Sequence, residues 1–148
     1  MNKITIIAYL LLFSGLAAAD SMMNQVAMEN IVKEMAQKSK GKQGFVEFSY
    51  RNVKMYLISD AKHNRMRIIS PIVKYKDMLP HDIESVLESN FHKSLDARYA
   101  ISKGVLYSAY IHPLSALRKY EITSAVNQVA NLVLSFGKEY TSGTLTYK

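Results

Sequence analysis

Residues 97–136 contain the two patterns on which the fold depends, ARYAISKGVLYSAYI (97–111) and EITSAVNQVANLVLSF (121–136). The first predicts a β-hairpin, because two β-prone runs are joined by Ser102-Lys103-Gly104, where Gly104 can adopt the positive φ of a tight turn. Both faces of VLYSAYI are apolar, so we expect this strand to be internal in a sheet. The second pattern predicts an amphipathic helix that ends at Gly137.

The predicted helix is apolar over an unusually wide arc. At about 100° of rotation per residue its apolar side chains cover roughly 200°, whereas an ordinary surface helix needs about 100°. A single sheet does not use the whole arc, so we expect one flank to face a second helix or a partner subunit. The candidate residues for a partner or dimer surface on this helix are Ala125, Ala130, Leu132 and Leu134.

Three strand-like runs precede this region and predict an antiparallel meander: GFVEFSY (44–50), VKMYLIS (53–59) and RMRIISPIVKY (65–75). Their alternation places one apolar face against the core and leaves a mixed face that we expect to be half covered. On that mixed face, Tyr56, Ile58 and Ile69 are candidate protein-binding residues. Pro71 cannot donate a ladder hydrogen bond, so the third strand should bend, bulge or lie at an edge there.

Helical periodicity covers two further segments, residues 20–39 and residues 80–91. In the second of these, Ile83, Val86, Leu87 and Phe91 are spaced for burial. The basic run KSKGKQG (38–44) predicts a connector, and EYTSGTLTYK (139–148) a polar tail that frays or pairs locally. The expected order is α-β-β-β-α-β-β-α. This is an α+β fold in which helices pack on an antiparallel sheet of about five strands.

Composition places the chain in one domain and one compartment. The 148 residues are 49% hydrophobic and 21% charged, with a net charge of +7 and no cysteine. Disulfides and thiol chemistry are therefore excluded. Residues 1–19, with an apolar run from Ile4 and Ala17-Ala18-Ala19 before Asp20, match a signal peptide with an A-x-A cleavage site. We expect a single domain at residues 20–148. We also expect the protein to be exported, to the bacterial periplasm or to the exterior, and to contact the membrane only through the signal peptide before its cleavage.

Neither catalytic nor metal-binding chemistry has a local signature in this sequence. The four histidines, His63, His81, His92 and His112, include no i, i+4 pair. The chain has no G-x-S-x-G, P-loop or G-x-G-x-x-G motif. We therefore expect no catalytic residue, no metal and no cofactor.

Basic residues interleaved with tyrosines leave another interpretation open. A module for anionic lipid or nucleic acid would need Lys33, Lys40, Lys42, Lys54, Arg65 and Arg67 to cluster on one face. Nucleic acid is not the expected partner, because an exported protein seldom meets it.

One longer segment, LESNFHKSLDARYAISKGVLYSAYIHPLSAL (87–117), together with the element order, resembles the type III secretion chaperone-like fold. This is the Tir chaperone superfamily with its YbjN-type sensory-regulator relatives, and the resemblance spans most of the chain after residue 19. Its most telling residues are turn and packing positions: Ser89-Asn90-Phe91, Ala97-Arg98-Tyr99, Gly104 and His112-Pro113-Leu114. The resemblance implies a small homodimer that binds an extended segment of a client protein and is not an enzyme.

These patterns lead to one functional expectation with two alternatives. We expect an exported, non-enzymatic, chaperone-like domain that binds protein, either as a homodimer or with a client polypeptide. The alternatives are a small periplasmic enzyme of unknown chemistry and a basic module for anionic lipid or nucleic acid. An enzyme should show a concave pocket with converging polar groups, and a binding module should show an exposed apolar strip.

Overall fold

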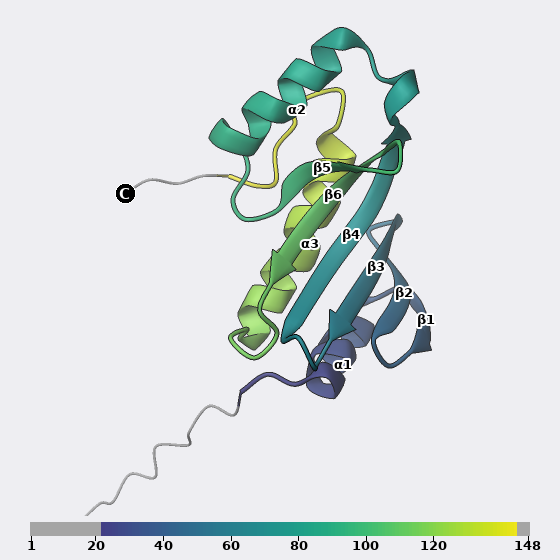
Figure 1. Ribbon diagram of the computed structural model, residues 1–148, viewed down its shortest axis with the longest axis vertical. Helices are drawn as coiled ribbons and strands as arrows, with labels where there is room; N and C mark the ends of the chain where they lie inside the picture. Colours follow the sequence, from purple (N-terminus) through teal and green to yellow (C-terminus); the bar gives the residue numbers. More distant parts are fainter. Residues whose placement is uncertain (1–21, 145–148) are drawn as a thin grey trace, which may run out of the picture.

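The computed structural model describes residues 22–144, so the predicted signal peptide lies outside the described residues. The elements in chain order are α1 (Gln25–Met35), β1 (Lys38–Lys42), β2 (Phe45–Tyr50), β3 (Val53–Asp60), β4 (Arg65–Lys74), the short 3-10 helix η1 (Tyr75–Asp77), α2 (Pro80–His92), β5 (Arg98–Ser102), β6 (Val105–His112) and α3 (Lys119–Ser135) (Figure 1). This confirms the α+β class. None of the described helices is long and apolar enough to cross a membrane.

The strands form one antiparallel sheet in the order β1-β2-β3-β4-β6-β5. Two hairpins close through turns with consecutive positive φ angles, at Arg51 and Asn52 (52° and 61°) and at Lys103 and Gly104 (48° and 73°). Such turns match the right-handed twist of paired strands, and the predicted hairpin at 97–111 is confirmed. The register of β4 against β6 shifts just after Pro71, so the expected irregularity is a bulge.

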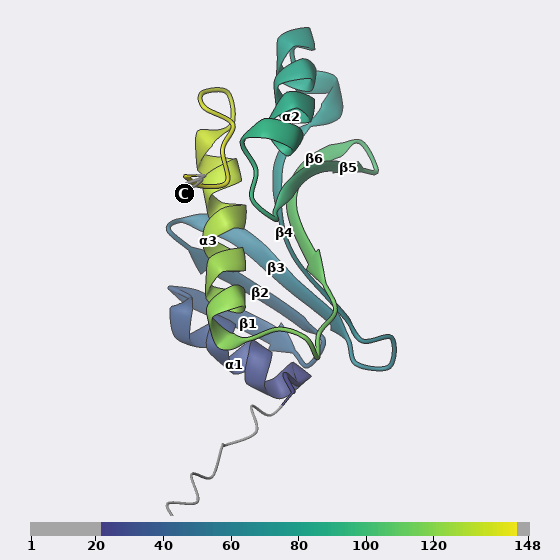
Figure 2. The same cartoon turned by 90° about the vertical axis from the view of Figure 1, so that its left-hand side faces the viewer.

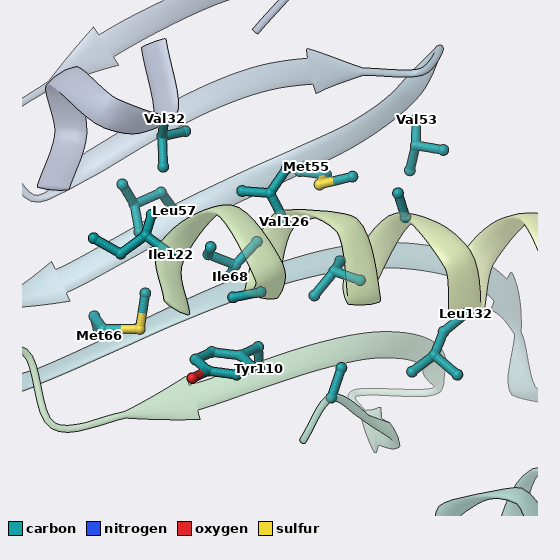
Figure 3. Close-up of a cluster of buried hydrophobic side chains, with 14 of the residues drawn as sticks. Val32, Val53, Met55, Leu57, Met66, Ile68, Tyr110, Ile122, Val126 and Leu132 are labelled. Atoms are coloured by element: carbon teal, nitrogen blue, oxygen red, sulfur yellow. The ribbon is translucent and has the colours of Figure 1, made fainter. Parts of the chain in front are cut away.

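Helices α1 and α3 both lie on one side of the sheet and form the core with it (Figure 2). Alternate residues of the strands meet the apolar sides of these helices, and each residue labelled in Figure 3 is at most 5% exposed. Burying a large apolar side chain contributes about 1.5–3 kcal/mol, so this layer supplies most of the stability. The residues labelled in Figure 3 are Val32, Val53, Met55, Leu57, Met66, Ile68, Tyr110, Ile122, Val126 and Leu132.

Residues 38–42 form the edge strand β1, where the sequence predicted a connector. The strand pairs along its whole length with β2, which gives the sheet six strands. Gly41 has a φ of 135°, and a Cβ there would lie 2.2 Å from the carbonyl oxygen of Phe45, so only glycine fits. The Glu29 carboxylate on α1 accepts a hydrogen bond of 2.7 Å from the Gly44 amide and ties the hairpin down. Tertiary pairing thus overrides the weak β-propensity of KSKGK.

The segment after α3 folds back onto α2, whereas the sequence predicted a polar tail. Tyr140 is buried, and its hydroxyl donates a hydrogen bond of 2.6 Å to Asp82. The Ser89 hydroxyl donates to the Tyr140 carbonyl. On the same helix, the Asn90 amide accepts from the Tyr99 N–H (2.7 Å) and donates to the Tyr99 carbonyl (3.0 Å). These bonds hold α2 at the end of the sheet. Those from Asn90 also provide partners for the backbone N–H and carbonyl of Tyr99 on the edge strand β5.

Candidate functional site

The side of the sheet opposite α1 and α3 carries no helix over β2, β3 and β4 among the described residues (Figures 1 and 2). We call this side the open face. Its side chains alternate along each strand with those of the core. Phe45, for example, precedes the buried Val46, and Ile69 follows the fully buried Ile68. A sheet face without a covering layer leaves its apolar side chains in contact with water, which makes it a candidate binding surface.

Apolar side chains lie next to one another across the strands of the open face. We call Phe45, Tyr56, Ile58, Ile69 and Ile111 the open-face strip, and Ala109, which pairs with Ile69, is buried. The register pairs Phe45 with Ile58, and Tyr56 with Ile69. The rings of Phe45 and Tyr56 are 5.8 Å apart between centroids. The predicted residues Tyr56, Ile58 and Ile69 are thus brought together on one partly exposed surface. Their ability to bind protein stays a prediction.

Basic residues surround this strip on three strands. They are Lys38, Lys40 and Lys42 of β1, Lys54 of β3, and Arg65 and Arg67 of β4, and we call them the basic border. The anionic-ligand interpretation required six cations on one face, and all of them except Lys33 belong to this border. Lys33 lies on α1, where it pairs with Glu29 at 3.8 Å. Five of the six required cations therefore lie on the open face, and Lys33 does not.

Glu47 sits inside the basic border and is shared by two lysines, Lys40 at 3.4 Å and Lys54 at 3.2 Å. Burial acts to raise the pKa of Glu47, but hydrogen bonds from Lys54 and Lys40 outweigh it and hold that pKa below its ordinary value. Contact with Tyr56, followed by Glu47, raises the pKa of Lys54. Glu47 and Lys54 are therefore both charged at neutral pH. A shallow hollow of about 340 Å³ lies beside them at the β1–β2 edge.

The strongly perturbed titrating groups lie away from the open face. Burial raises the pKa of Tyr110 to about 12 and raises that of Tyr99 further. Both are core tyrosines, and the Tyr99 hydroxyl donates a 2.7 Å hydrogen bond to the Leu132 carbonyl. Among residues 22–144, no three His, Asp or Glu side chains are grouped so that they could hold a metal ion. What the open face presents is apolar area beside cationic side chains.

Three of the four candidate residues on α3 are inside the protein, which corrects the expectation of a free helix flank. Ala125, Ala130 and Leu132 are fully buried, and only Leu134 is exposed, at 44%. The reason is that α1 packs against α3, while the C-terminal segment folds back at the other end (Figure 2). Asn131, for example, donates a hydrogen bond of 2.9 Å to the Ser142 carbonyl. The wide apolar arc is used within one chain.

Helix α2 exposes an apolar ridge that the sequence assigned to the core. Leu87 and Phe91 lie one turn apart and are 65% and 83% exposed, while Val86 is buried as expected. Leu79, just before the helix, is 57% exposed. Helical spacing alone indicated an apolar side for α2. It did not show that α2 sits at the end of the sheet, where no other described element covers that side.

Comparisons with known proteins found structural similarity only. No family model and no curated protein matches the chain. A chain of the solved HopA1–SchA chaperone–effector complex is similar in structure, with a TM-score of 0.56 at 11% sequence identity. The similarity covers 74% of this chain and 88% of that chain. This similarity supports the secretion-chaperone-like α+β fold that the sequence resemblance implied.

Proposed function

We propose that the protein is an exported, non-enzymatic module that binds a client polypeptide on its open face. The observation that carries the proposal is the open-face strip, which no described helix covers and which a border of fixed cations surrounds. A partner that buries this strip removes apolar area from water and gains specificity from charge. The fold similarity to a chain of a chaperone–effector complex supports a protein partner.

The client surface is tested with two matched substitutions on opposite sides of the molecule. Ile69→Asp puts a carboxylate on the open-face strip, and Leu134→Asp puts one on the exposed end of α3. Both proteins should fold like the wild type. Suppression of aggregation of an unfolded model protein, measured by light scattering, should be lost in Ile69→Asp and kept in Leu134→Asp. The reverse result would move the binding surface to the helix.

Self-association belongs to a different surface in this proposal. Two copies that met through their open faces would bring two basic borders together, and this repulsion opposes pairing. The α2 ridge carries less charge, namely the exposed Glu84 and Glu88 beside Leu87 and Phe91, and a two-fold axis would bury Leu87 and Phe91 of both copies. We expect a homodimer by sedimentation that Phe91→Ser converts to a monomer with unchanged thermal unfolding. A wild-type mass that stays monomeric at all concentrations would reject this dimer.

Export is the part of the proposal that rests on residues 1–20 alone. The apolar run and the Ala17-Ala18-Ala19 site before Asp20 support cleavage by a signal peptidase. The mature protein should begin within a residue or two of Asp20. N-terminal sequencing of the protein from a periplasmic fraction checks this, and a retained Met1 would contradict it.

A further inference from the structure

The positive charge of the basic border is mostly left without a partner in the chain itself. Glu47 neutralises part of Lys40 and Lys54. Within residues 22–144, no carboxylate lies within ion-pair distance of Lys38, Lys42, Arg65 or Arg67. All of β1 is exposed, so its three lysines stand at the rim of the open face. The surface therefore attracts anionic groups toward its edges.

Charge and apolar area are arranged in an order that a polypeptide can match. The register places Lys42, Phe45, Ile58 and Arg67 in one row across four strands. Three strand spacings of about 4.8 Å separate the two cations, about 14 Å in all, or about four residues of extended chain. A segment with carboxylates four residues apart and apolar side chains between them reaches both cations and covers the strip. We propose that the client segment is acidic, with carboxylates flanking an apolar stretch, an inference that rests on the proposed function.

Other occupants fit this face less well. The Tyr56 ring has the Lys54 ammonium 5.3 Å from its centroid and the Phe45 ring 5.8 Å away, so it offers a poor platform for stacking bases. Within the strip only Phe45 and Ile111 are exposed, while Tyr56, Ile58 and Ile69 are half-buried, so the strip offers little apolar area to a lipid layer. The Glu47 carboxylate would repel the continuous phosphates of a membrane or a nucleic acid. A polypeptide can place an uncharged residue next to it.

The test uses a fluorescein-labelled peptide that contains Glu-Val-Phe-Val-Glu, and a second peptide with glutamine in place of both glutamates. Anisotropy titrations should show tighter binding of the acidic peptide, with an affinity that falls as salt is raised. The double variant Lys42→Gln with Arg67→Gln should bind the acidic peptide about fivefold more weakly, the effect of losing two exposed ion pairs. Lys119→Gln with Lys138→Gln removes the same charge at α3 and should bind like the wild type.

The outcomes separate the two levels of the proposal. Equal binding of both peptides, abolished by Ile69→Asp, would overturn the acidic client and leave polypeptide binding on the open face intact. Binding of neither peptide, or binding that Ile69→Asp leaves unchanged, would overturn the proposed function itself. Phosphatidylglycerol vesicles and single-stranded oligothymidylate serve as competing probes. Tighter binding of either probe than of the acidic peptide, with the same sensitivity to the Lys42 and Arg67 changes, would replace the polypeptide by that ligand.

Discussion

The two faces of the sheet carry similar apolar residues in different surroundings. Ile68 and Ile69 are neighbours on β4, yet Ile68 is fully buried under the helices and Ile69 is partly exposed on the open face. On the covered face, the strands bring mainly apolar side chains against the helices. On the open face, a similar apolar strip is bordered by lysines and arginines. The difference teaches that the pleat of the strands separates, residue by residue, the side chains that stabilise the fold from those left at the surface.

The largest effect is expected from placing a charge on the covered face. Val129 of α3 is fully buried, so Val129→Asp puts a carboxylate among apolar side chains of the core. The free energy of unfolding should fall by about 3–5 kcal/mol. Leu134→Asp, on the exposed end of the same helix, is the control and should change it by about 0.5 kcal/mol or less. Equal losses by denaturant unfolding would mean that α3 is not packed as described.

A second pair of variants compares the faces directly with one substitution. Ile68→Ala leaves a cavity under α3 and should lower the free energy of unfolding by about 2–5 kcal/mol. Ile69→Ala removes a partly exposed side chain and should cost about 1 kcal/mol or less. Urea unfolding of both proteins measures this. Similar values for the two would show that something covers the open face in the free protein.

A third variant concerns the end of the covered face, where the C-terminal segment closes it. Tyr140→Phe removes the hydrogen bond from the Tyr140 hydroxyl to Asp82 and should lower the free energy of unfolding by about 1 kcal/mol at neutral pH. The Tyr140 hydrogen bond, and then the Leu79 amide, hold the pKa of Asp82 below its usual value of 3.8.

The sign of the pH dependence follows from that lowered pKa. A carboxyl whose pKa is lower in the folded state stabilises the protein above its unfolded pKa, and this stabilisation is lost as pH falls through the folded value. The difference between wild type and Tyr140→Phe should therefore be largest near pH 7 and shrink below about pH 4. A difference that is constant from neutral to acidic pH would show that Asp82 is not the partner.

The smallest effect is expected on the open face. Glu47→Gln removes the carboxylate shared by Lys40 and Lys54 and leaves the covered face untouched. Thermal unfolding should be nearly unchanged, because all three side chains reach solvent. The acidic peptide should bind about two- to threefold more tightly, since two more cations become available to it. Weaker binding would indicate that Glu47 itself contacts the ligand.

Much of the fold could be predicted from local patterns. Alternation placed Tyr56, Ile58 and Ile69 on the face away from the core, since side chains of one strand point in turn to opposite sides. Helical periodicity located α2 and α3. The predicted hairpin at 97–111 closes where Gly104 supplies a positive φ of 73°. Each of these features depends on residues a few positions apart, so the sequence carries it directly.

The remaining features depend on which segments meet in space. The apolar arc of α3 indicated how much of the helix surface is buried. It is α1 and the C-terminal segment that determine that Ala125, Ala130 and Leu132 are covered within one chain. The basic run 38–42 becomes a strand because β2 offers it an unpaired edge. The sequence by itself determined the two faces of the sheet. Only the tertiary structure decided which one stays open, because covering a surface is a property of its neighbours and not of its own residues.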